Sequence, residues 1–129
     1  VHMTGKIGVL VALEIDAECG AEPLVRLAKD LAMHIAASPV EAIRADQVDQ
    51  NMLEKEREII ASQARESGKP EEIIEKMIEG RLTKFLNEIS LETQSFVKDP
   101  QKTVAQLVKD VSGEIGVEIG LREFIKFQF

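Results

Sequence analysis

The stretch "SGKPEEIIEKMIEGRLTKF", residues 67–85, decides the fold because it combines a helix start, a helical period and a narrow apolar stripe. Gly68 can take the left-handed conformation that ends a helix, and Pro70 can open the next one. Glu71 and Glu72 then fall in the first turn, where carboxylates favour the positive end of the helix dipole. The stripe is too narrow for a helix surrounded by a globular core. This helix therefore needs a partner along its length.

The segment before it supplies that partner. Residues 46–66 also have a helical period, with many charged and amide side chains and a thin apolar seam. The second seam continues to residue 89. Two seamed helices joined by a tight turn predict an antiparallel helical hairpin. The seam residues expected to face the other helix, or a second copy of the hairpin, are Met52, Ile59, Ile73, Met77 and Phe85.

The flanking segments predict a small α+β unit. Residues 6–14, "KIGVLVALE", are a β-branched and aliphatic run typical of a buried strand. Apolar residues then recur at helical spacing over residues 24–37, and "ASP" at 37–39 ends this amphipathic helix, because a residue before proline is pushed away from the α region. The hairpin follows as an insertion.

The last third of the chain changes period again. Residues 91–97 are compatible with an extended segment, and the Asp-Pro pair at 99–100 predicts the start of a short helix that Ser112 and Gly113 end. Alternating apolar residues from Ile115 onward predict a half-buried strand that turns or bulges near Gly120. The predicted fold class is α+β: a small β-sheet with packed helices, interrupted by the inserted antiparallel helical hairpin.

Composition limits the classes of partner. The chain has 129 residues, within the range of one domain, with 16 basic and 23 acidic residues and a net charge of -7. An acidic chain repels phosphate backbones and anionic lipids, and its basic residues are interleaved with glutamates, so neither nucleic acid nor a membrane is an expected partner. The single Cys19 excludes an intrachain disulfide and fits a reducing compartment. With no secretory pattern at the start, the cytoplasm is the expected location.

Catalytic and metal motifs are missing from the sequence. His2 and His34 have no second His or Cys at metal-ligand spacing, and no HExxH or GxxxxGK[ST] motif occurs. Carboxylates one helical turn apart, such as Glu71 and Glu75, are typical of a solvated helix face. We therefore expect no enzyme activity, cofactor or metal.

Two features leave alternatives open. His34 lies one step off the apolar stripe of its helix, where a boundary histidine hydrogen-bonded to a neighbour is favoured over a ligand or contact role. Phe96 and Val97 form an apolar pair in a loop. Either they fill a gap between the hairpin and the core, or they form an exposed knob that binds a partner.

Four segments carry a resemblance to a known family. In their order and spacing, "KIGVLVAL", "LAMHIAASP", "SGKPEEIIEKMIEGRLTKF" and "SFVKDPQKTVAQLVKD" resemble the C-terminal half of the bacterial elongation factor Ts family. The resemblance implies a guanine-nucleotide exchange factor for elongation factor Tu. It also implies a core subdomain at residues 1–39 and 90–129, split by a dimerisation hairpin at residues 40–89.

The resemblance also implies roles for individual residues. Full-length family members carry a Thr-Asp-Phe-Val motif, associated with opening the nucleotide site of the GTPase, in another subdomain; this tetrapeptide does not occur here. We therefore expect a fragment that docks on the third domain of elongation factor Tu but does not expel GDP. The implied contact residues are His2, Phe96, Val97 and Lys98. A structural module that self-associates through the hairpin is the alternative function.

Overall fold

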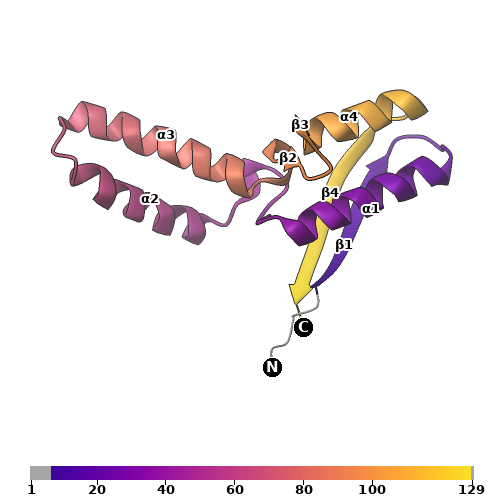
Figure 1. The fold of residues 1–129 in the computed structure, drawn as a ribbon, viewed down its shortest axis with the longest axis horizontal. Coiled ribbons are helices and arrows are strands. Elements are labelled where there is room, and N and C mark those ends of the chain that lie inside the picture. Colours follow the sequence, from indigo (N-terminus) through magenta and orange to yellow (C-terminus); the bar gives the residue numbers. More distant parts are fainter. Residues whose placement is uncertain (1–6, 129) are drawn as a thin grey trace.

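In the computed structural model, which describes residues 7–128, a long helical hairpin extends from a body of helices and a two-stranded sheet (Figure 1). The α+β fold class is confirmed, with two small antiparallel sheets in place of one. The elements in chain order are β1 (Ile7–Ile15), α1 (Ala21–Ala37), the 3-10 turn η1 (Ala45–Gln47), α2 (Gln50–Arg65), α3 (Glu71–Ile89), the 3-10 turn η2 (Leu91–Thr93), β2 (Ser95–Phe96), β3 (Asp99–Thr103), α4 (Val104–Ile115) and β4 (Ile119–Gln128).

The main sheet pairs the first and last strands of the chain. β1 runs antiparallel to β4, from Ile7 opposite Gln128 to Ile15 opposite Ile119. The register shifts after Ala12, where Arg122 is the extra residue on β4. The predicted bulge therefore exists, two residues beyond Gly120. Alternate residues of both strands face the body and pack on its core.

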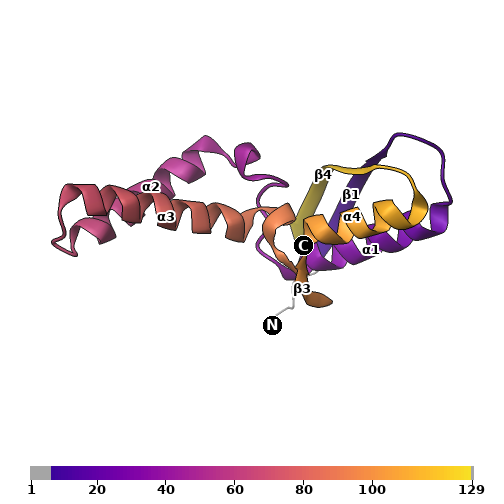
Figure 2. The ribbon, with the colours of Figure 1, turned by 90° about the horizontal axis from the view of Figure 1, so that it is seen from above.

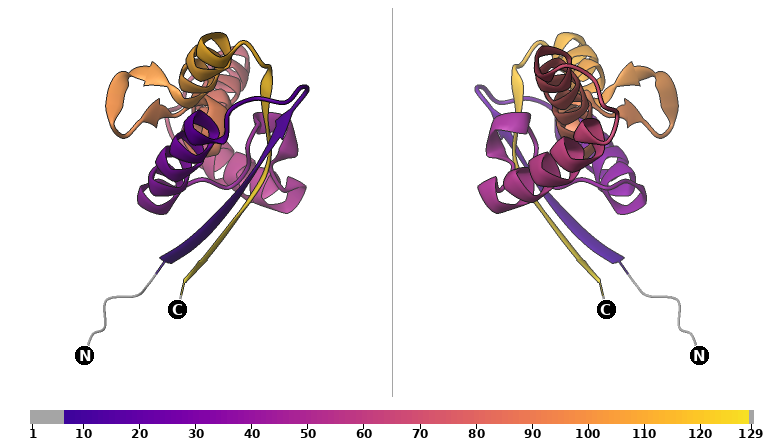
Figure 3. Two further views of the ribbon diagram at one scale, coloured as in Figure 1. Left: turned by 90° about the vertical axis from the view of Figure 1, so that its right-hand side faces the viewer. Right: turned by 90° about the vertical axis from the view of Figure 1, so that its left-hand side faces the viewer.

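Helices α1 and α4 lie between this sheet and the small β2–β3 sheet (Figures 2 and 3). Leu27, Leu31 and Ile35 form the buried stripe of α1, and Val104 and Val108 that of α4. They belong to one apolar core, which also contains Val40, Ile43, Leu91, Phe96 and Ile119. This core holds the β2–β3 segment against the body.

The prediction of a helix start at Asp99–Pro100 was wrong. Asp99 pairs with Phe96 in a strand, and α4 begins only after Thr103, whose hydroxyl accepts a hydrogen bond from the Gln106 N–H (3.2 Å). A side-chain oxygen at this position satisfies one of the free donors of a helix start. The Asp99 Oδ1 also accepts a backbone hydrogen bond, from the Gln101 N–H (3.3 Å), but residues 99–103 are extended and no helix begins there. The predicted end at Ser112 and Gly113 was also wrong, because α4 continues to Ile115.

The helix α4 ends at Gly116, which has a φ of 70°. This left-handed conformation is the usual end of a helix and is readily available only to glycine. Gly113, by contrast, lies inside the helix. The helix end was predicted at Gly113, but the left-handed conformation that ends α4 occurs at Gly116.

Helices α2 and α3 form the predicted antiparallel hairpin, with the turn at Gly68 (φ 71°). Of the predicted seam, Met77 and Phe85 pack between the two helices and Met52 packs at the hairpin base. Ile59 and Ile73 lie outside, 52% and 41% exposed. Each step along a helix turns by about 100°, so the next residue in each helix faces the partner instead. The buried residues of the seam are Ile60, Ala61, Ala64, Ile74, Ile78 and Leu82.

The base of the hairpin is fastened to the body by backbone hydrogen bonds. The Glu41 N–H donates to the Ile89 carbonyl, and the Leu91 N–H donates to the Ala42 carbonyl, both at 2.8 Å. Ala42, Val48 and Ile89 form a small buried cluster at this joint. Among residues 7–128, no helix is both long and apolar enough to cross a membrane.

Candidate protein-docking site

The β2–β3 segment ends in a two-residue turn, Val97–Lys98, between the paired residues Phe96 and Asp99. It projects from the side of the body (Figure 3). Phe96 is only 4% exposed and belongs to the core, whereas Val97 is 41% exposed. The two residues therefore differ: Phe96 is part of the core of the body, and Val97 presents an apolar side chain to solvent.

The backbone pairing of β2 with β3 does not by itself determine the conformation of the turn. The register passes from Ser95 opposite Thr103 directly to Phe96 opposite Asp99, so residues 100–102 are skipped. Neither Val97 nor Lys98 has a positive φ, which excludes the two turn types that best match the twist of paired strands. The turn therefore depends on contacts with the body.

His34 supplies one of these contacts from within the core. It lies in the last turn of α1 and is 0% exposed. Its Nδ1 accepts a hydrogen bond from the Val97 N–H (3.2 Å), and its Nε2 lies 2.8 Å from the Gln94 Oε1. A backbone N–H can only donate, so the ring is neutral and carries its proton on Nε2. The hydrogen-bonded histidine expected from the sequence is present, but it is buried and not at a boundary.

Gln94 extends this contact to two other segments. Its Nε2 donates to the carbonyls of Glu88 (2.7 Å) and Pro39 (3.2 Å). Its amide thus joins the end of α3, the segment after α1 and the ring of His34. Among residues 7–128, every buried side-chain nitrogen or oxygen has a hydrogen-bond partner.

Lys98 makes the second contact between the turn and α1. Its Nζ lies 3.0 Å from the Asp30 Oδ1, and the two side chains are 55% and 26% exposed. An ion pair this exposed contributes on the order of 0–1 kcal/mol at most. Its effect is to orient Lys98 along the helix, beside the exposed Val97.

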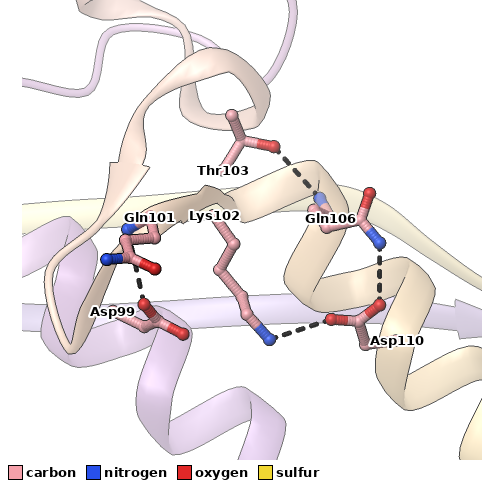
Figure 4. A network of polar contacts seen from close by, with 6 residues as sticks. All are labelled: Asp99, Gln101, Lys102, Thr103, Gln106 and Asp110. Atoms are coloured by element: carbon pink, nitrogen blue, oxygen red, sulfur yellow. Dashed lines mark hydrogen bonds and ion pairs between the residues drawn. The ribbon is translucent and has the colours of Figure 1, made fainter.

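A polar network holds the other arm of the segment (Figure 4). The Lys102 Nζ donates to the Asp110 Oδ2 at 2.9 Å, and the Gln106 Nε2 donates to the Asp110 Oδ1 at 2.7 Å. The hydrogen bonds from Lys102 and Gln106 lower the pKa of the Asp110 carboxyl. The hydrogen bond and negative charge of Asp110 raise the pKa of Lys102. The network joins Lys102 of β3 to Gln106 and Asp110 of α4.

This network gives a pH-dependent contribution to stability. Because the pKa of Asp110 is lowered by folding, its contribution is present above the unfolded pKa and is lost as the pH falls through the folded one. Because the pKa of Lys102 is raised, its contribution is lost as the pH rises through the folded value.

We expect Lys102→Met to raise the pKa of Asp110 toward its ordinary value. A carbon-detected NMR titration of the Asp110 carboxyl measures this, and an unchanged pKa would contradict the ion pair.

The sequence-predicted contact residues meet only in part. Phe96, Val97 and Lys98 lie together at the turn, whereas His2 lies outside the described residues. Asp30, His34 and Gln94 were missed as parts of the site. The available signal was the spacing of Asp30 and His34, because polar residues four apart lie on the same face of a helix. In the described part of the chain, no three His, Cys, Asp or Glu side chains group into a possible metal site.

Comparison with known proteins places the chain in one protein family. The family model for elongation factor Ts matches residues 1–129. The chain is 48% identical to elongation factor Ts of Acetivibrio thermocellus and 42% identical to that of Desulforamulus reducens, over 99% of the chain in both cases. It is 45% identical to that of Geobacter sulfurreducens, over 98% of the chain. The chain spans about 60% of the length of these relatives.

Proposed function

The chain belongs to the elongation factor Ts family, and from this premise we propose that it binds elongation factor Tu through the turn Val97–Lys98. The bound protein is the GTPase that the family resemblance implies, and the expected location is the cytoplasm, where elongation takes place. The chain acts as a partner of the GTPase and not as a catalyst of a covalent reaction.

One observation supports the turn as the point of contact above all others. Val97 combines an exposed apolar side chain with a backbone held from below by His34. Protein interfaces depend on a few apolar anchors that are already ordered before binding, because ordering a free loop costs binding energy. Lys98 and Asp30 place charges beside the anchor, as in the polar rim of an interface. Phe96 supports the turn from inside.

We further propose that these 129 residues provide docking without driving GDP release. The Thr-Asp-Phe-Val motif that the family resemblance associates with opening the nucleotide site does not occur in them. The anchoring surface and the residues that disturb the nucleotide then lie in different parts of the family's architecture. Docking and exchange are therefore separable in an experiment.

Two measurements on the same protein test the proposal. In a calorimetric titration with elongation factor Tu bound to GDP, we expect a complex to form in the micromolar range. In stopped-flow experiments with a fluorescent GDP analogue, we expect the rate of GDP release to stay close to that of elongation factor Tu alone. No complex at high micromolar concentration would overturn docking, and strong acceleration of release would overturn the division of roles.

A second function is self-association through the hairpin, which Ile59 and Ile73 support. Both are large apolar side chains that lie outside the α2–α3 seam, 52% and 41% exposed. A second hairpin packed on them would remove this apolar surface from water, at about 25 cal/mol per Å² buried.

The hairpin proposal predicts a concentration-dependent mass. Sedimentation equilibrium over micromolar to millimolar concentrations is expected to show a monomer–dimer equilibrium, and Ile59→Glu is expected to shift it toward monomer at least tenfold, because a dimer would bury the added charge. Val25→Glu, at a site that is 50% exposed on α1, is the matched control. A monomer throughout the series, or equal effects of the two variants, would rule out this use of the hairpin.

A further inference from the structure

We infer that His34 is a positioning residue for docking: it holds the Val97 amide and so fixes the direction in which the Val97 side chain is presented to the partner. This inference rests on the proposed function, because it assigns the support of that same turn. His34 itself is 0% exposed, so its ring is not available for direct contact with a partner protein. Its effect on binding is therefore indirect.

The backbone of the turn is the first reason. With neither residue at a positive φ and residues 100–102 skipped in the register, pairing of β2 with β3 does not determine the turn. Valine, which is β-branched, is also poorly suited to the positive φ that a better-matched turn would require. An external acceptor for the Val97 N–H is therefore needed to select one conformation.

The position of the ring is the second reason. His34 is held by the α1 backbone within the core, and its ring centroid lies 6.1 Å from that of Phe96 at an interplanar angle of 34°. Its Nε2 is occupied by Gln94, which fixes the proton on that nitrogen. Nδ1 is left as an acceptor in a fixed place, and the Val97 N–H is its partner at 3.2 Å. The histidine thus transmits the rigidity of the core to the exposed turn.

Other groups near the ring do not replace this acceptor. The Lys98 Nζ is only a donor and is bonded to the Asp30 carboxylate, so it offers the Val97 N–H no acceptor. The amide of Gln94 is fully engaged with His34, Glu88 and Pro39. When Nδ1 is removed, the structure offers the Val97 N–H no second acceptor among these neighbours. A donor that loses its partner in this way is costly to keep near a core.

Two substitutions separate the two ring nitrogens. In His34→Asn the side-chain oxygen can occupy the place of Nδ1 but does not reach Gln94. In His34→Gln the longer side chain reaches toward Gln94 but leaves the place of Nδ1 empty. Both variants lose the ring and its packing on Phe96. They differ in which hydrogen bond they keep, and this makes each the control for the other.

The readouts are the hydrogen-exchange rate of the Val97 amide and the dissociation constant for elongation factor Tu. Relative to His34→Asn, we expect His34→Gln to raise the hydrogen-exchange rate of the Val97 amide about tenfold. We also expect it to raise the dissociation constant for elongation factor Tu about tenfold. Each change is the effect of about one hydrogen bond. Equal exchange rates in the two variants would overturn the inference, because His34 would then act only through general stability. If the unsubstituted chain does not bind, the proposed function fails, while the exchange rates still decide whether His34 holds the turn.

A measurement on the unsubstituted protein keeps the inference testable if both variants unfold. A long-range proton–nitrogen NMR spectrum reports which ring nitrogen of His34 carries the proton. We expect a protonated Nε2 and an unprotonated Nδ1 at neutral pH. A protonated Nδ1 would overturn the inference, since it is no acceptor for the Val97 N–H.

Discussion

Replacing Val97 with aspartate is expected to weaken binding to elongation factor Tu by about 100-fold, or roughly 3 kcal/mol. Val97 is the exposed apolar residue of the turn, and Phe96 behind it is buried. In the proposed complex the Val97 side chain makes an apolar contact with elongation factor Tu, and Val97→Asp removes that contact. The aspartate carboxylate must also lose its water on binding without gaining a charged partner. The dissociation constant from calorimetric titration measures the effect directly.

The same substitution at Val25 is the matched control. Val25 is 50% exposed, on the same helix as His34. The two are nine positions apart along α1, which places them about 13.5 Å apart along the helix axis. We expect Val25→Asp to change the dissociation constant less than threefold, with thermal unfolding of both variants close to that of the parent. Equal losses in the two variants would mean that charge alone, and not the turn, weakens binding.

Replacing Phe96 with alanine is expected to lower the free energy of unfolding by about 3–5 kcal/mol. Its ring is 4% exposed and packs in the core that α1, α4 and the β2–β3 segment share. Removing it takes away the buried apolar surface and leaves a cavity beside His34. A typical domain of this size has about 5–15 kcal/mol in total, so the variant is close to the limit of stable folding. Urea unfolding monitored by circular dichroism measures the loss.

Two neighbouring substitutions show whether the loss comes from burial. Phe96→Leu keeps most of the apolar volume and is expected to be clearly more stable than Phe96→Ala. Val97→Ala, at the adjacent exposed position, is expected to change the free energy of unfolding by no more than about 0.5 kcal/mol. A Phe96→Ala variant as stable as Val97→Ala would contradict the placement of the ring in the core.

Local signals account for what the sequence predicted well. The hairpin follows from residues close together in the chain: Gly68 can end one helix, and Pro70 precedes the next, as the structure confirms. The position of the seam was predicted wrongly at Ile59 and Ile73, because Ile59 and Ile60 are adjacent isoleucines, as are Ile73 and Ile74. A sequence period does not separate two adjacent apolar residues that differ by about 100° around the helix. Packing against the other helix does.

The site was harder to predict because its contacts join distant parts of the chain. His34 bonds to residues 60 and 63 positions away, Gln94 and Val97. No local pattern shows that a polar residue next to an apolar stripe has such partners. The Asp-Pro pair at 99–100 is ambiguous for a similar reason: it suits a helix start, but the pairing of Asp99 with Phe96 and the cap at Thr103 place the start at Val104.

Cross-saturation NMR tests the central claim most directly, namely that the turn Val97–Lys98 is where the chain meets elongation factor Tu. The chain is deuterated and labelled at its methyl groups, and protonated elongation factor Tu is irradiated in the complex. We predict that the Val97 methyls lose the most intensity and that those of Val25 and Leu10 keep theirs. Loss confined to the hairpin, at Ile59 or Ile73, with Val97 unaffected would contradict the account.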